Sequence, residues 1–262
     1  PDKPGTSRMS AHLKFGTIHP RTLAADLDGR DGGAGAYLRE LAFRDFYAAV
    51  LDQWPSSAWR NWNANFDSIE VDSGPDAEAA FDAWKHGRTG YPIVDAGMRQ
   101  LLGSGFMHNR VRMIVASFLV KDLHLPWQWG ARWFMEQLVD ADVASNQHGW
   151  QWCAGTGTDA APYFRVFNPT AQGEKFDTSG DYVRRWVPEL AHVTGSAVHE
   201  PWDVDDGYAH GYPQRIVDHA VDVVFECSGR RSAMEAGLSQ LRRGGRLVLV
   251  GAGIDPPAFD PN

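Results

Sequence analysis

Residues 108–120 read HNRVRMIVASFLV, and the spacing of their apolar side chains decides the fold class that we expect. From Val111 onward, apolar residues recur at i, i+3, i+4, i+7 and i+8, which is the buried stripe of an amphipathic helix. Asn109, Arg112 and Met113 form a second stripe at helical spacing. The segment therefore predicts a helix that packs on one side and offers polar groups on another.

The same periodicity predicts further helices on both sides of this segment. They cover about residues 36–54, 92–102 and 127–138, and proline or glycine bounds the first two. Residues 61–80 are aperiodic and predict a long surface loop, and the chain after Gly149 also reads as loop-rich. Up to about residue 220 the chain is expected to be mainly α-helical, without a convincing pair of strands.

The pattern changes after residue 220. VDVVFEC at 221–227 and GRLVLVG at 245–251 are short, β-branched and bounded by glycine or polar residues, which is typical of strands. A helical pattern at 232–241 separates them. We expect a strand-helix-strand fragment here that is too small to form an independent domain.

Composition excludes several classes of protein. The 262 residues are 43% hydrophobic with a net charge of −8, which argues against nucleic-acid binding over the whole surface but permits a local basic cleft. No apolar run is long enough for a membrane span, and two cysteines without metal spacing are typical of a reducing compartment. We expect a cytoplasmic, monomeric protein without a metal ion.

Between residues 140 and 176, carboxylates, amides, glycines and large aromatic residues alternate closely. Five of the eleven tryptophans lie between residues 127 and 152, and such rings form either a core or a platform for a flat ligand. Asp140 and Asp142 lack a histidine at ligand spacing, which argues against a metal site. A buried Arg112 needs a carboxylate partner, and one of these two residues can provide it. In an extended loop, Trp150 and Trp152 would face opposite ways.

A hydroxyl-rich stretch opens the chain. Thr6, Ser7 and Ser10 precede or begin a short helical pattern, where hydroxyls and backbone amides suit a phosphate group. A plain helix cap explains the same residues, and spacing alone leaves both interpretations open.

These blocks together resemble the helical FAD-binding domain of the DNA photolyases and cryptochromes. The resemblance covers about residues 5–220, in order and without large gaps. It rests on TSRMS (6–10), RELAFRDFY (39–47), TGYPIVDAGMRQL (89–101), MHNRVRM (107–113), DADVASNQHGWQWCAGTGTDAAPYFR (140–165) and FNPTAQGEKFD (167–177).

The resemblance implies FAD as cofactor, DNA with pyrimidine dimers as partner, and a set of site residues. The FAD-binding residues would be Thr6, Ser7, Arg8, Met9, Ser10, Tyr37, Asn109, Arg112, Asp140, Ala141, Asp142 and Asn146. The DNA side would comprise Glu40, Phe43, Arg44, Asn109, Arg110, Met113, Trp152 and Gln172, with Glu40, Asn146 and Trp152 closest to the chemistry. Trp84, Trp127 and Trp150 match the family's electron-transfer chain.

The implied reaction is light-driven. Excited, reduced FAD would pass an electron to a cyclobutane pyrimidine dimer, the ring would split, and the electron would return.

The chain departs from the family at three positions: Phe43 and Phe106 replace tryptophans, and Ala141 replaces a glycine. The family's amino-terminal antenna domain is expected to lie outside this chain.

Residues 221–262 are similar to a piece of the nucleotide-binding domain of medium-chain zinc alcohol and polyol dehydrogenases, without its glycine-rich turn and zinc ligands. We interpret them as a foreign fragment joined near Ala220, through fusion, rearrangement or sequence assembly.

The main alternatives to dimer repair are a cryptochrome-like photosensor, which Phe43 favours, and an inert chimera. A nicotinamide oxidoreductase is disfavoured because the phosphate-binding turn is missing.

Overall fold

The structure is a computed structural model of the 262-residue chain, and it describes residues 5–27, 32–158, 167–217, 221–226 and 241–249. The chain divides into two compact units, Pro1–Ile216 and Val217–Asn262, which are described separately below.

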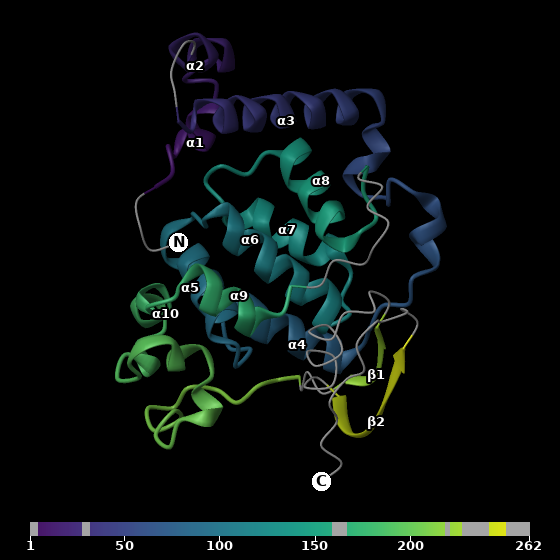
Figure 1. Ribbon diagram of the computed structural model, residues 1–262. Helices are drawn as coiled ribbons and strands as arrows, with labels where there is room; N and C mark the ends of the chain where they lie inside the picture. The colour runs from purple at the N-terminus through teal and green to yellow at the C-terminus, as the bar shows by residue number, and fades with distance from the viewer. Residues whose placement is uncertain (1–4, 28–31, 159–166, 218–220, 227–240, 250–262) are drawn as a thin grey trace. The chain divides into compact units, whose positions relative to one another are not determined.

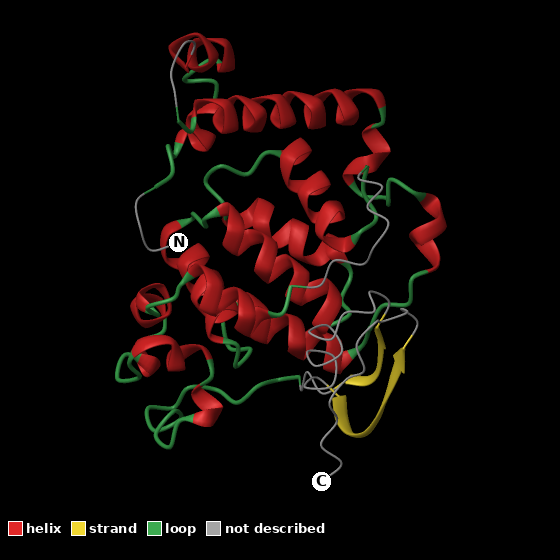
Figure 2. Ribbon diagram, in the orientation of Figure 1, coloured by secondary structure: helices red, strands yellow, loops and turns green. Residues whose placement is uncertain are grey.

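The first unit is built from helices (Figures 1 and 2). Its α-helices are α1 (Met9–Lys14), α2 (Pro20–Leu27), α3 (Ala34–Gln53), α4 (Pro75–Lys85), α5 (Pro92–Ser104), α6 (Asn109–Ser117), α7 (Trp127–Gln137), α8 (Val143–Ala154), α9 (Pro169–Phe176) and α10 (Asp181–Trp186). Short 3₁₀ helices are η1 (Pro55–Ala58), η2 (Ala64–Ser68), η4 (Pro188–Leu190), η5 (Gly195–His199) and η6 (Pro201–Asp203), and η3 (Phe118–Asp122) is a short π-helix. The mainly α fold class is confirmed.

Helix α5 forms the centre of the core. Every residue from Pro92 to Met98 is buried, and α5 packs against α6, α9 and α10. A helical segment that is buried on all sides is stable only inside a protein, where each face meets another element. Gly97 permits the close approach of α6, since a Cβ on it would lie 2.5 Å from a methyl carbon of Val111.

A buried carboxylate links the end of this unit to the start of α5. Asp95 is fully buried and accepts hydrogen bonds from the backbone and hydroxyl of Thr89, at 2.7 and 2.6 Å, and from the backbone of Gly90, at 3.0 Å. The hydroxyl of Tyr212 donates a fourth hydrogen bond, of 2.7 Å. Burial raises the pKa of Asp95, and these donors oppose that effect. Asp95 therefore anchors a segment 117 residues away in sequence.

Most of the predicted helices are present, and two local predictions are wrong. The helices expected at 36–54, 92–102, 108–120 and 127–138 correspond to α3, α5, α6 with η3, and α7. The surface loop expected at 61–80 contains η2 and the first half of α4, which Pro75 opens at its first turn. Residues 143–154 are helical, so Trp150 and Trp152 do not lie in an extended loop.

The second unit contains two described strands. β1 (Val221–Glu226) and β2 (Leu241–Leu249) are parallel, with Val223 opposite Arg246 and Glu226 opposite Leu249. These strands agree with the expected positions of the tail's strand patterns, β2 beginning four residues earlier than expected. The helix predicted between them lies outside the described residues.

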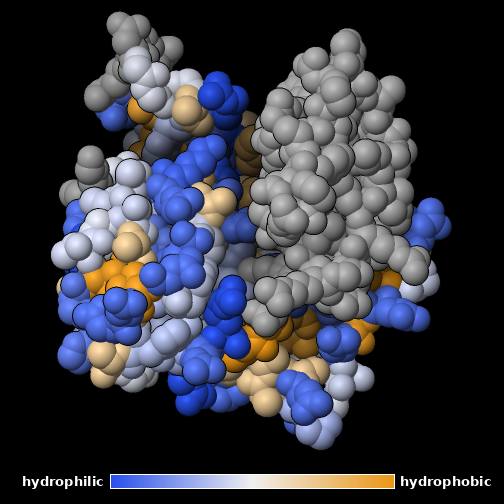
Figure 3. All heavy atoms as spheres, turned by 60° about the horizontal axis from the view of Figure 1, so that its bottom comes forward, coloured by the Kyte–Doolittle hydropathy of each residue, from blue (hydrophilic) through white to orange (hydrophobic). Residues whose placement is uncertain are grey.

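Figure 3 shows one face of the molecule, on which hydrophilic residues separate the hydrophobic ones into limited patches. In the part of the chain that the structure describes, no helix is long and apolar enough to cross a membrane. The same residues contain no group of three or more histidine, cysteine or acidic side chains that is arranged to hold a metal ion.

Candidate flavin and DNA site

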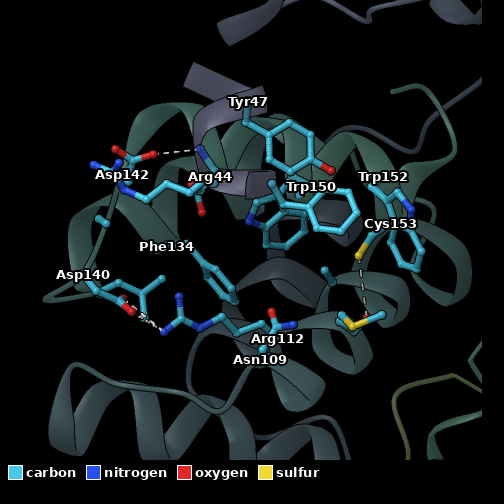
Figure 4. A pocket seen from close by; sticks show the side chains of 18 of the residues that line it. Arg44, Tyr47, Asn109, Arg112, Phe134, Asp140, Asp142, Trp150, Trp152 and Cys153 are labelled. Atoms are coloured by element: carbon cyan, nitrogen blue, oxygen red, sulfur yellow. Dashed lines mark hydrogen bonds and ion pairs between the residues drawn. The ribbon is translucent and has the colours of Figure 1, made fainter. Parts of the chain in front are cut away.

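A cavity of about 420 Å³ lies among α3, α6, α7 and α8 (Figure 4). Helix α8 packs against the other three helices, so its side chains form the centre of the cavity wall. The volume is within the usual range for a small-molecule or cofactor site. The lining residues are Glu40, Phe43, Arg44, Tyr47, Asn109, Arg112, Met113, Ala116, Phe134, Leu138, Asp140, Ala141, Asp142, Ser145, Asn146, Gly149, Trp150, Trp152 and Cys153.

One end of the cavity carries an ion pair between α6 and the segment that precedes α8. The guanidinium of Arg112 donates to both carboxylate oxygens of Asp140, at 2.9 and 3.0 Å, and its Nε donates to the carbonyl of Met107, at 2.7 Å. The Asp140 side chain is 3% exposed, whereas that of Arg112 is 23% exposed. Of the two candidate carboxylates, Asp140 is therefore the partner of Arg112, and the pair fixes the direction of the guanidinium.

The neighbouring Asp142 begins helix α8. Its side chain accepts a hydrogen bond from the backbone of Ser145, at 2.9 Å, which caps the helix. The amine of Lys14, on α1, contacts the carbonyl oxygen of Ala141. Ala141 has a negative φ, so the replacement of a glycine here causes no backbone strain.

Asn146 lines the cavity in a fixed orientation. Its amide nitrogen donates to the carbonyl of Ala131, at 2.9 Å, and to the side-chain oxygen of Gln147, at 2.8 Å. Gln147 in turn donates to the carbonyl of Ala58, at 2.6 Å. Both N–H groups of the Asn146 amide are thereby used, so its carbonyl oxygen is the group that can accept a hydrogen bond from a ligand.

Aromatic side chains form the inner wall. Trp150 is 3% exposed and meets the ring of Phe134 edge to face, with the ring centroids 5.0 Å apart. Gly130 makes room for this indole, because a Cβ on Gly130 would overlap the ring of Trp150. The wall is therefore aromatic, apolar and rigid, which suits the ring system of a planar ligand.

Three lining residues, Glu40, Phe43 and Trp152, are more exposed. Phe43 is 53% exposed, and its ring stacks on Tyr47, with the centroids 6.4 Å apart. Trp152 is half-buried and stacks on Phe167, at 6.5 Å between centroids. Glu40 adds an exposed carboxylate to the same cavity. Two aromatic side chains and one acceptor thus lie where a second ligand can enter from solvent.

Several residues expected at the site do not line the cavity. Ser7, in the predicted phosphate loop, shares a hydrogen bond of 3.0 Å with the hydroxyl of Tyr37, on α3. Arg8 has a left-handed backbone, with φ of 53°, and its guanidinium lies 5.3 Å from the ring of Phe106. The guanidinium of Arg112 lies 5.7 Å from the same ring. The loop is therefore connected to the cavity through Phe106 and Lys14, although Thr6, Met9 and Ser10 are absent from the lining.

Two residues expected on the DNA side also lie outside the cavity. The guanidinium of Arg110 stacks over the ring of Phe176, at 4.7 Å from its centroid. The side-chain oxygen of Gln172, on α9, is buried, and the described residues provide no hydrogen-bond partner for it.

The three tryptophans of the predicted electron chain differ in their contacts. Trp84 is fully buried and meets Trp150 edge to face, with the centroids 6.0 Å apart. Trp127 is 5% exposed and donates a hydrogen bond of 2.9 Å to Asn61. Among the described residues, no ring contact joins Trp127 to either of the other two.

Sequence reasoning missed part of the cavity wall. Tyr47 and Cys153 line it without having been predicted, together with Ala116, Phe134, Leu138, Ser145 and Gly149. Helical spacing in the sequence could have identified two of them. Tyr47 follows Glu40 by seven residues and Cys153 follows Trp150 by three, which places each pair on one helix face. Burial raises the pKa of the Cys153 thiol to about 12, so the thiol stays neutral.

Curated proteins similar to the chain include two bacterial deoxyribodipyrimidine photo-lyases. The relative from Escherichia coli is 53% identical over 224 residues, which are 82% of this chain and 47% of the relative. The relative from Streptomyces griseus is 50% identical over 218 residues, again 82% and 47%. The chain thus spans about half the length of the curated relatives it matches.

Solved structures show the same likeness. A class III photolyase from Agrobacterium tumefaciens superposes with a TM-score of 0.77 at 44% identity, over 91% of this chain and 49% of that one. A Synechocystis cryptochrome superposes with a TM-score of 0.75 at 31% identity, over 89% and 48%. The model of the family described as the FAD-binding domain of DNA photolyase matches residues 37–224. The chain therefore belongs to the family of FAD-binding domains of DNA photolyase.

Proposed function

We propose that this chain binds FAD and repairs cyclobutane pyrimidine dimers in DNA in a light-driven reaction. The observation that carries the proposal is the composition of one cavity, in which an Arg112–Asp140 ion pair and an oriented Asn146 share walls with Glu40, Phe43 and Trp152. The activity of the named relatives agrees with it. Residues up to about 220 would form the FAD-binding domain.

The residues present fit FAD. The aromatic wall of Phe134 and Trp150 suits a planar ring, and Arg112 offers donors beside it. The carbonyl oxygen of Asn146 is an acceptor, and a reduced flavin would offer it a ring N–H group that an oxidised flavin lacks. This arrangement supports the reduced form as the active one. When bound, FAD supplies the electron that opens the cyclobutane ring and receives it back.

The chain's own residues would hold the DNA lesion at the mouth of the cavity. A dimer stacks poorly in a duplex, so moving it into an aromatic pocket costs only about a few kcal/mol. Trp152 and Phe43 offer faces for its rings, and Glu40 offers an acceptor for its N–H groups. Asn109 and Met113 lie beside them on the second stripe of α6.

A photosensor without repair activity is the second candidate, and Phe43 is the observation that favours it. A phenylalanine at this exposed position keeps an aromatic face but lacks the larger area and the N–H donor of an indole. Binding of the lesion would then be weaker, whereas the flavin side of the cavity would be unaffected.

An anaerobic illumination assay tests the proposal. The protein is loaded with FAD, reduced chemically with dithionite and mixed with single-stranded DNA that contains dimers. Restoration of intact pyrimidines under blue light, but not in darkness, supports repair. Stable flavin binding without any restoration favours the photosensor, and Phe43→Trp then shows whether the missing indole is the cause.

A further inference from the structure

The aromatic contacts behind the cavity continue beyond the predicted electron chain. Trp150 contacts Trp84, and Trp84 stacks on Phe81, with the ring centroids 5.7 Å apart and the planes 15° from parallel. Phe81 then contacts Trp129, on α7, at 5.3 Å between centroids. Trp129 is only partly buried. A continuous row of rings therefore runs from the cavity wall to the protein surface.

Trp84 is unsuitable as the end of an electron chain. It is fully buried, and its indole N–H donates a hydrogen bond of 3.0 Å to the backbone carbonyl of Val115. A carbonyl oxygen does not take up a proton from an indole, so an oxidised Trp84 would retain a positive charge in an apolar environment, which is costly. The free energy falls when an electron from a more exposed donor neutralises this charge on Trp84.

Trp127 has the same limitation. Its side chain is 5% exposed and its N–H donates to the amide oxygen of Asn61, which is also a poor proton acceptor. In contrast, water can accept the indole proton at a partly exposed ring such as Trp129.

Trp133, one helical turn after Trp129, is a matched neighbour with different surroundings. The amine of Lys85 lies 5.3 Å from the centre of the Trp133 ring, and this positive charge opposes the removal of an electron from that ring. Its indole nitrogen is also buried, without a hydrogen-bond partner among the described residues. Trp133 therefore lacks both an acceptor for its proton and a favourable electrostatic environment.

We infer that Trp129 is the surface end of an electron path that runs from Trp150 through Trp84 and past Phe81. This inference rests on the proposed FAD site. Bound FAD would supply the light-excited acceptor for one electron from Trp150. Trp84 would then refill Trp150, and Trp129 would refill Trp84. Oxidised Trp129 releases its indole proton to water, and a thiol in solution then restores one electron and one proton, becoming a thiyl radical that pairs to a disulfide.

The test compares photoreduction of bound FAD in variants on the same helix. Protein loaded with oxidised FAD is illuminated anaerobically with a thiol, and the loss of flavin absorbance is followed. Trp129→Phe is expected to slow photoreduction severalfold, and Trp133→Phe is expected to leave it unchanged. A wild-type rate of photoreduction in Trp129→Phe overturns the inference. If Trp127→Phe then loses photoreduction completely, the electron path runs through Trp127 instead.

A second readout locates the oxidised residue directly. After illumination in air without a thiol, peptide mass spectrometry is expected to find oxidised tryptophan mainly at residue 129, and to find less of it there in Trp84→Phe. Oxidation mainly at another tryptophan contradicts the path. Repair by the dithionite-reduced wild-type protein does not require photoreduction, so it tests the proposed function independently of this inference.

Discussion

Arg112 holds both carboxylate oxygens of Asp140 at 2.9 and 3.0 Å, across the end of the cavity that we assign to the flavin. The two residues are 28 positions apart in the sequence, so the pair joins α6 to the start of α8. Because the Asp140 side chain is almost fully buried, a partner of opposite charge is needed there, and Arg112 provides it.

Replacing Asp140 with Asn is expected to destabilise the apoprotein by about 2 kcal/mol, the usual contribution of hydrogen bonds to a charged group. It should also weaken FAD binding, because Arg112 loses its fixed direction. Urea unfolding and titration with FAD measure the two effects. Glu136→Gln is the matched control, since its contact with Arg132 is exposed and contributes little. Equal effects of the two substitutions would contradict a role for burial.

Replacing Gly130 with Ala is expected to destabilise the protein by about 1 to 3 kcal/mol, the usual cost of overpacking. The new methyl group would overlap the ring of Trp150 and force the indole toward the cavity. Gly149→Ala on α8 is the control, because no atom lies within 4 Å of its added methyl group. That control should leave the stability of the apoprotein unchanged or raise it by up to about 1 kcal/mol. Thermal unfolding of both variants measures these two changes in stability.

Tyr212→Phe removes one of four hydrogen bonds to the buried carboxylate of Asp95. The expected loss of stability is about 1.5 to 3 kcal/mol, the usual contribution of one hydrogen bond to a charged group, because the Asp95 oxygen that accepts from Tyr212 keeps only the Gly90 donor. Tyr208→Phe, at a half-buried side chain, is the control. Amide hydrogen exchange should show faster exchange near Thr89 and Ile216, whose backbone groups are hydrogen-bonded to each other at 3.0 Å. Unchanged exchange there would show that Asp95 does not anchor this segment.

Stability should depend on the ionisation of Asp122, because burial raises the pKa of this carboxyl to about 7. Between its unfolded pKa of about 4 and the folded value, the folded protein binds more protons than the unfolded chain, so stability falls as pH rises through this range. A shift of this size corresponds to at most about 4 kcal/mol. Asp122→Asn should remove that part of the pH dependence of the unfolding free energy. An identical pH profile in the variant would mean that other groups cause it.

The sequence predicted helices where one apolar stripe repeats, as in α5 and α6. It failed at α8, because helix and loop signals compete there: glycine, asparagine and two tryptophans interrupt the apolar period. The conclusion that Trp150 and Trp152 face different ways still holds, since residues two apart on a helix also point to nearly opposite sides. Trp150 is buried and Trp152 is half-buried, as that geometry requires.

The amino-acid sequence by itself determined the mainly helical class, the ends of the long helices and the family resemblance, because periodicity, caps and motifs are local properties of a chain. Only the tertiary structure decided which distant segments meet: Lys14 with Ala141, Trp84 with Trp150, and Tyr212 with Asp95. Such contacts depend on how complete helices pack against one another, and the spacing of residues along the chain does not determine that packing. The same reason explains why the row of rings that ends at Trp129 could not be derived from sequence separation.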